Sequence, residues 1–334
     1  MTTNNDWQLI QTQLNDKKLT PIISNRVLQQ AVFGADDGAM QLWLKKIAMY
    51  PLADSNLSRV SQFRQVNYKS RKPMVKEYLE ALNRAVLRAH PSQDTARQEQ
   101  LKIEAQTRPF SDFVLHDVLC LNLDPYQDNP LTLLARLELP LYITTSPHSF
   151  IEEALKRWGK EPRTEVYAWR EELQRDLKPE YRFDPDFEPS EATPLVYHLH
   201  GIDDCPDSLV LTEDDFLGFL VNVAQDIKNP DVVPSVVRYA LSSSLLLLLG
   251  YQLHTWDLRV LLHGLIQRHQ RRERSFTVQF VPPDMPNVTN HAEYCNYLQG
   301  YFEQTTFEVH WGDTLVFLQE LWERKSNPVV DDEW

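Results

Sequence analysis

Glycine is scarce in this chain, with 9 residues among 334, well below the usual share of roughly 7%. A glycine-rich loop that cradles phosphate therefore has few positions at which it could occur. The three cysteines, Cys120, Cys205 and Cys295, stand far apart and form no CxxC pair. This spacing excludes a disulfide framework and a four-cysteine zinc site, and it favours a reducing, cytoplasmic setting.

Long apolar runs and an excess of basic residues are missing as well. The longest aliphatic run, Leu245 to Leu249, is far too short to cross a bilayer, and the N-terminal sequence has no signal-peptide pattern. The formal net charge of -13 argues against direct nucleic-acid binding, because phosphate contacts depend on clustered lysine and arginine. We therefore expect neither a membrane segment nor a nucleic acid partner.

Strand-like and helix-like segments alternate along the chain. Short apolar runs at 19–24, 139–145, 194–200, 245–250, 276–281 and 306–310 are typical of strands, with a short extended piece at 208–211, and amphipathic segments separate most of them. The run at 245–250 is apolar on both faces, as a central parallel strand covered by helices requires. The pattern predicts an α/β fold, a Rossmann-like doubly wound parallel sheet in one domain over residues 1–334.

Three segments depart from this alternation. Residues 39–137 show helical periodicity almost throughout and predict a helical subdomain inserted between the first two strands. Residues 178–194 are rich in proline and lead directly into the strand at 194–200, which suits a loop that acts as a lid or wall. Residues 325–334 predict an acidic, flexible tail.

Polar residues follow four of the predicted strands, at 24–26, 144–148, 200–204 and 250–257. Ligands of parallel sheets bind at the carboxyl ends of the strands, so we expect these four turns to converge. The central candidate is His200, which closes the buried run PLVYHLH. A histidine can exchange a proton near neutral pH, although a lone histidine at a strand end more often serves structure.

Taken together, the turns resemble those of the bacterial sirtuin-like domains. The resemblance rests on ITTS and FIEEAL within 143–155, HLHG at 198–201, LTEDDF at 211–216, and LLLLGYQL with WDLRVLL within 246–262. These segments occur in the family's order and cover most of the chain. The resemblance implies an NAD site in a Rossmann-like domain, in a group that includes many NAD-consuming effectors of anti-phage defence.

The resemblance also implies roles for individual residues. His200 matches the catalytic histidine and would act on a ribose hydroxyl or on water while nicotinamide leaves. The second turn of the family reads T-x-N-x-D. The matching positions here are Thr144 or Thr145, then Ser146 in place of the asparagine and His148 in place of the aspartate. Ser146 would position ribose or water more weakly, because serine lacks the fork of an amide. His148 is either a compensating polar group or the start of its own helix.

The first and fourth turns depart from the family pattern. The first carries Ser24, Asn25 and Arg26 in place of a glycine-rich loop. Its helix N-terminus and Arg26 would hold phosphate, or else Ser24 or Asn25 caps the helix and Arg26 faces solvent. In the fourth turn Gly250 would allow close approach of a ligand and Tyr251 would stack on a ring, or else both serve only the turn and its packing.

Three further positions complete the set of candidate cofactor-binding residues. Gly201 follows the histidine, and Asp203 would hold a ribose hydroxyl unless it is an ordinary solvated loop acid. Asp257 keeps the family's residue type in the fourth turn.

The function that the resemblance implies is hydrolysis of NAD to ADP-ribose and nicotinamide, by an oligomer that a partner protein or sensor activates. We expect no metal, and no protein deacylase, because the family's deacylases carry two CxxC pairs that this chain lacks. The alternative is a catalytically impaired module that binds NAD or ADP-ribose, or serves as a scaffold. The missing phosphate-loop glycines and the missing asparagine favour this alternative.

Overall fold

The computed structural model describes residues 3–27, 32, 49–51, 56–118, 128–226, 229, 232–251, 259, 261, 266, 274–279, 290–304 and 307–326. They contain a seven-stranded sheet with the strand order β3-β4-β2-β1-β5-β6-β7. The strands are β1 (Leu19–Ile23), β2 (Leu141–Thr144), β3 (Arg163–Val166), β4 (Leu195–His198), β5 (Leu245–Leu249), β6 (Ser275–Gln279) and β7 (Phe307–Trp311). All neighbouring strands pair in parallel, so their carboxyl ends lie at one edge. The predicted Rossmann-like α/β fold is confirmed.

The sheet lies between two apolar layers because its side chains alternate. In β5, Leu245, Leu247 and Leu249 point into one layer, whereas Leu246 and Leu248 point into the other. The first layer includes residues of α1 (Asn4–Asn15), α8 (Pro130–Arg136), α9 (Phe150–Arg157) and α15 (Thr314–Ser326). The second includes α11 (Glu213–Asp226), α12 (Ser235–Ser243) and α14 (His291–Glu303). Burial on both faces explains why β5 is a continuous aliphatic run.

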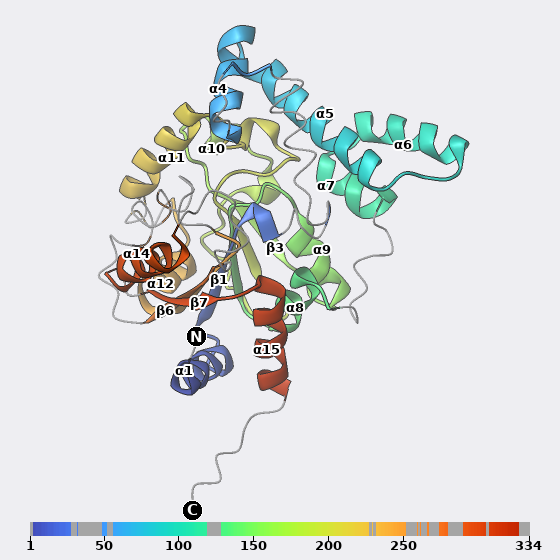
Figure 1. Ribbon diagram of the computed structural model, residues 1–334. Helices are drawn as coiled ribbons and strands as arrows, with labels where there is room; N and C mark the ends of the chain where they lie inside the picture. The colour runs from blue at the N-terminus through green and yellow to red at the C-terminus, as the bar shows by residue number, and fades with distance from the viewer. Residues whose placement is uncertain are drawn as a thin grey trace, which may run out of the picture.

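Between β1 and β2 the described residues form helices and no strand. These are α4 (Leu57–Tyr68), α5 (Arg71–Ala89), α6 (Thr95–Thr107), α7 (Phe110–Phe113), the π-helical turn η2 (Val114–Val118) and α8. Figure 1 shows α4, α5 and α6 projecting beyond the sheet, on the side away from α1 and α15. Arg71 at the start of α5 pairs with Asp215 of α11 at 2.5 Å and donates to the carbonyl of Leu209. These contacts fix the helical insertion against the chain that follows β4.

The edge strand β3 was not expected from the sequence. Its four residues, RTEV, include two charged side chains and pair only with β4. Polar residues are common on edge strands, where they discourage pairing with other chains, but they hide the apolar pattern that identifies a strand. The short helices α10 (Leu173–Asp176) and η3 (Pro179–Tyr181) follow it.

The segment after β4 differs from the prediction in one respect. The 3-10 turn η4 (Pro206–Ser208) includes the first residue of the extended piece expected at 208–211; Leu209 after it is extended, but residues 209–211 form no strand. A capping box begins α11. The Asp215 amide donates to Thr212 Oγ1 at 3.0 Å, and the Thr212 amide donates to Asp215 Oδ2 at 2.9 Å.

Candidate functional site

The turns after β1, β2, β4 and β5 lie side by side, because these strands are neighbours in the sheet. Backbone hydrogen bonds continue the strand pairing into the turns. The Ser24 amide donates to the Leu249 carbonyl at 3.0 Å, and the Thr145 amide donates to the Ile23 carbonyl at 3.0 Å. The polar residues at the four strand ends therefore share one edge of the sheet, where ligands of such folds bind.

The first turn contains a buried hydroxyl without a partner. Ser24 is 4% exposed, and its Oγ makes no hydrogen bond within the described part of the chain. The expectation that Ser24 caps the following helix through this hydroxyl is thus wrong. Asn25 Oδ1 accepts a hydrogen bond from Ser146 Oγ at 3.0 Å. Arg26 is exposed to solvent.

The fourth turn packs against the first. Gly250 has a φ of +75°, and a Cβ placed on it would lie 2.3 Å from Val27 Cγ2 and 2.5 Å from Ser24 Oγ. Only glycine allows this approach, and the space is filled by the protein's own atoms. Tyr251 is buried, with its hydroxyl 2.9 Å from Thr145 Oγ1. Asp257, the last candidate of this turn, lies outside the described residues.

The second turn connects to its neighbours through Ser146, which is fully buried. Its hydroxyl donates to Asn25 in the first turn and accepts a hydrogen bond from the His148 amide at 3.3 Å. Its carbonyl lies 2.8 Å from Nδ1 of His198 at the end of β4. Ser146 is therefore a structural bridge between three strand ends in the free protein.

His148 belongs to a buried polar cluster with Asp203 and Ser111. His148 Nδ1 lies 2.9 Å from Asp203 Oδ2, and the same oxygen accepts hydrogen bonds from the Ser111 amide at 2.9 Å and from its hydroxyl at 2.5 Å. Asp203 is 2% exposed, so it is no solvated loop acid. His148 Nε2 and Asp203 Oδ1 have no hydrogen-bond partner among the described residues. Ser111 comes from α7, 92 residues before Asp203, and no sequence pattern predicted this contact.

His198, at the end of β4, forms a second buried cluster that the sequence did not reveal. Nε2 lies 2.7 Å from Glu152 Oε1, while Nδ1 faces the Ser146 carbonyl. Both ring nitrogens thus face acceptors, an arrangement that suits the imidazolium with its two donors. Burial lowers the pKa of His198, but the Glu152 carboxylate and these hydrogen bonds outweigh it, so the pKa is raised above its ordinary value. Glu152, whose carboxylate faces this imidazole, lies in α9.

His200, two residues after His198, lies in an apolar environment instead of a polar one. Its ring packs edge-on against Phe216 at 5.2 Å and Phe219 at 4.8 Å between ring centroids. Burial alone lowers its pKa from 6.5 to about 3, without a contribution from any hydrogen bond or charge. His200 is therefore neutral throughout the physiological range, and 7% of its surface remains exposed. It combines a neutral imidazole with ring nitrogens that lack a protein partner among the described residues.

The chain after His200 is shaped by close backbone packing. Gly201 has a φ of +83°, and a Cβ there would lie 2.2 Å from the carbonyl oxygen of Ser208. Because glycine has no side chain, the backbone of Ser208 can pack directly against Gly201. Asp204 accepts hydrogen bonds from Lys178 Nζ at 2.5 Å and from the Tyr181 hydroxyl at 2.8 Å. These contacts hold the start of the proline-rich segment 178–194 beside the site, where a wall of the site would lie.

No group of three histidine, cysteine, aspartate or glutamate side chains in the described ranges is placed to hold a metal ion. None of the helices described above has both the length and the apolar character needed to cross a membrane.

Comparison with known proteins gives one family. Residues 140–305 match the model of the SIR2-like domain, from the start of β2 to the end of α14, a range that includes three of the four turns. A search of curated proteins finds no match. SIR2-like domains bind NAD. With this match, the parallel sheet and the order of its turns, the chain belongs to the family of sirtuin-like domains.

Proposed function

We propose that this chain binds NAD across the carboxyl ends of β1, β2, β4 and β5 and hydrolyses it to ADP-ribose and nicotinamide. The observation that carries the proposal is the state of His200. It is a buried, neutral imidazole without a protein partner on its ring nitrogens among the described residues, at the end of β4. The sirtuin-like resemblance expects the catalytic histidine at this position.

A neutral imidazole suits this reaction for two reasons. Its free lone pair can accept a hydrogen bond from a ribose hydroxyl or from the attacking water and so orient it, although a pKa of about 3 makes the ring a weak base at neutral pH. In addition, the ribose gains positive charge as nicotinamide departs, and a neutral ring beside it adds no repulsion. The phenyl rings of Phe216 and Phe219 maintain this state by excluding water from the imidazole.

Two serines would complete the contacts to the substrate. The unpartnered Ser24 hydroxyl is a buried donor at the end of β1, where the family's phosphate loop lies, and it fits a pyrophosphate oxygen. Ser146 would position ribose or water, but it must first release Asn25. One hydroxyl replaces several backbone amides of a glycine-rich loop, so we expect weaker NAD binding than such a loop provides.

We further propose that the chain works in the bacterial cytoplasm as an oligomeric effector of anti-phage defence, activated by a partner protein or sensor. The resemblance to NAD-consuming effectors supports this role. It is tested by expressing the wild type and His200→Ala in a phage-sensitive bacterium and measuring cellular NAD after infection. The proposal predicts that NAD falls only with the wild type; equal NAD levels in both strains contradict it.

The alternative is a module that binds NAD or ADP-ribose without turnover. The crowding of the first turn favours it, because Val27 and Ser24 occupy the space beside Gly250. Calorimetric titration with ADP-ribose, paired with chromatography of nicotinamide released from NAD, separates the two functions. Binding with release supports the hydrolase. Binding without release by any assembled form supports the module, and absence of binding contradicts both.

A further inference from the structure

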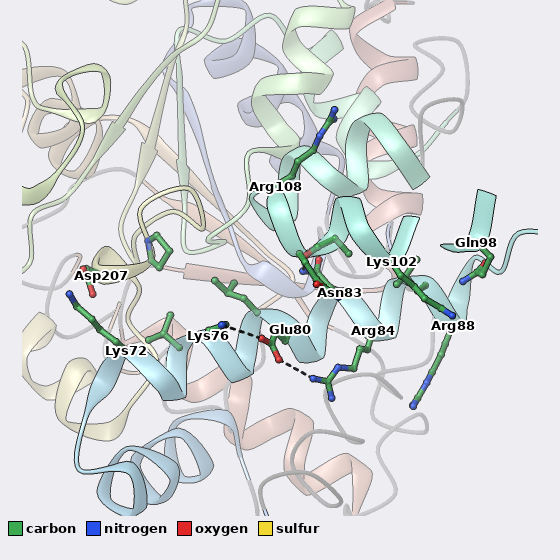
Figure 2. A pocket seen from close by; sticks show the side chains of 16 residues that line it. Lys72, Lys76, Glu80, Asn83, Arg84, Arg88, Gln98, Lys102, Arg108 and Asp207 are labelled. Atoms are coloured by element: carbon green, nitrogen blue, oxygen red, sulfur yellow. Dashed lines mark hydrogen bonds and ion pairs between the residues drawn. The ribbon is translucent and has the colours of Figure 1, made fainter. Parts of the chain in front are cut away.

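A large groove lies in the helical insertion, outside the four turns. It has a volume of about 1060 Å³ and runs between α5 and α6, with Pro206 and Asp207 of η4 at one end. Figure 2 shows Lys72 and Asp207 at that end, Asn83 near the middle, and Arg88 and Gln98 at the other end. No sequence pattern predicted this site, since α5 and α6 have the residue pattern of ordinary amphipathic helices.

The charge of the groove is opposite to that of the chain. Six basic side chains line it against two acidic ones, while the chain as a whole has a net charge of -13. The basic residues are Lys72, Lys76, Arg84, Arg88, Lys102 and Arg108. Four of the six are paired with acids: Lys76 and Arg84 with Glu80 at 3.9 and 2.9 Å, Lys102 with Glu99 at 2.5 Å, and Arg108 with Asp117 at 3.2 Å. Lys72 and Arg88 are exposed, and neither has an ion-pair partner in the described part of the chain. These two unpaired cations, one near each end of the groove, favour an anionic ligand.

The length and the floor of the groove restrict what that ligand is. Lys72 and Arg88 are separated by 16 helical residues, which corresponds to roughly 24 Å along α5. Between the basic side chains the floor is aliphatic, with Val75, Leu79 and Leu87. No aromatic side chain is among the described lining residues, although single-stranded nucleic acids depend on stacking of their bases on aromatic rings. An elongated ligand with aliphatic groups fits this surface better than a nucleic acid does.

Asn83 supplies a second, independent indication of a ligand. It lines the groove and is 8% exposed. Its Nδ2 donates to the carbonyl of Ala105 at 2.6 Å, whereas its Oδ1 has no hydrogen-bond partner among the described residues. A buried acceptor without a donor costs about 1–3 kcal/mol. A ligand that brings an N–H group to Oδ1 recovers this energy.

We propose that the groove binds an acidic peptide segment of a partner protein in an extended conformation. About seven residues span its length, at roughly 3.3 Å each. Carboxylates of the segment pair with Lys72 and Arg88, its aliphatic side chains cover the floor, and a backbone amide donates to Asn83 Oδ1. This site is independent of NAD turnover. It nevertheless adjoins the candidate site, because η4 forms one end of the groove and the Ser208 carbonyl packs on Gly201.

The test uses the full chain and an eight-residue peptide that alternates glutamate with leucine, measured by fluorescence anisotropy. A glutamine–leucine peptide, an eight-nucleotide thymidine strand and ATP are the comparison probes. We expect the acidic peptide to bind and the glutamine peptide to bind at least about tenfold more weakly. Methylation of the central backbone amides of the acidic peptide should weaken binding severalfold, since it removes the donor for Asn83.

The protein variants locate the binding. Lys72→Glu combined with Arg88→Glu should lower the affinity for the acidic peptide by about tenfold or more. Lys156→Glu combined with Arg175→Glu is the control, because these exposed residues lie outside the groove and the change in net charge is the same. Equal loss in both double variants, no binding of the acidic peptide, or tighter binding of the thymidine strand or ATP would each overturn the proposal.

Discussion

The burial of His200 makes the stability of the protein sensitive to acid. Its pKa is about 3 in the folded chain and returns to roughly 6.5 when unfolding exposes the ring to water. Below the unfolded value, the unfolded chain binds a proton that the folded chain does not bind. Burial thus lowers the pKa of this basic group in the folded chain. The stability that the neutral His200 contributes is therefore lost as the pH falls from 6.5 towards 3.

The size of the loss follows from the two pKa values. At pH 5 the solution is about 1.5 units below the unfolded pKa and still above the folded one. Each unit corresponds to roughly 1.36 kcal/mol, so His200 alone should lower the free energy of unfolding by about 2 kcal/mol between pH 7 and pH 5.

The measurement is urea unfolding of the wild type and of His200→Leu at pH 7 and pH 5. Leucine keeps an apolar side chain against Phe216 and Phe219 and cannot be protonated. Other titrating groups act equally in both proteins, so the wild type should lose about 2 kcal/mol more than the variant. Equal losses in the two proteins would refute the assignment of a buried, neutral His200.

Two further predictions concern the surroundings of this histidine. Gly201→Ala should lower the free energy of unfolding by about 3 kcal/mol or more, since it adds a left-handed backbone strain to a clash with the Ser208 backbone; unchanged urea unfolding would contradict it. Glu152→Ala should cost about 1–3 kcal/mol at pH 7, because it leaves Nε2 of the buried His198 without its hydrogen-bond partner. Glu152→Gln should cost much less, since a neutral His198 can accept its amide N–H, and equal unfolding of both variants would contradict this.

The sequence predicted the sheet well because strands that are buried on both faces consist of continuous apolar runs. The run at 245–250 and the polar ends of the neighbouring strands were enough for the fold and for the edge where the turns meet. The strand β3 escaped detection because charged residues interrupt its pattern. Glycine was informative for a different reason than expected: Gly201 and Gly250 do adopt positive φ values, but protein atoms fill the space beside them.

The internal contacts of the site could not be predicted from the sequence. Ser111 meets Asp203 across 92 residues, and Glu152 meets His198 across 46. Such contacts depend on how the helical insertion and α9 pack on the sheet, and no local pattern encodes that packing. The same limit explains why His198 and His200, two residues apart, could not be assigned opposite pKa shifts beforehand.

The catalytic role of His200 is tested by the rate of nicotinamide release from NAD, measured for the wild type, for His200→Ala and for the control His116→Ala. His116 is exposed and lies in η2, away from the four turns. The account predicts release by the wild type and the control, with a loss of about 100-fold or more in His200→Ala. It also predicts that His200→Ala still binds ADP-ribose. Equal rates of release in all three proteins would contradict the account.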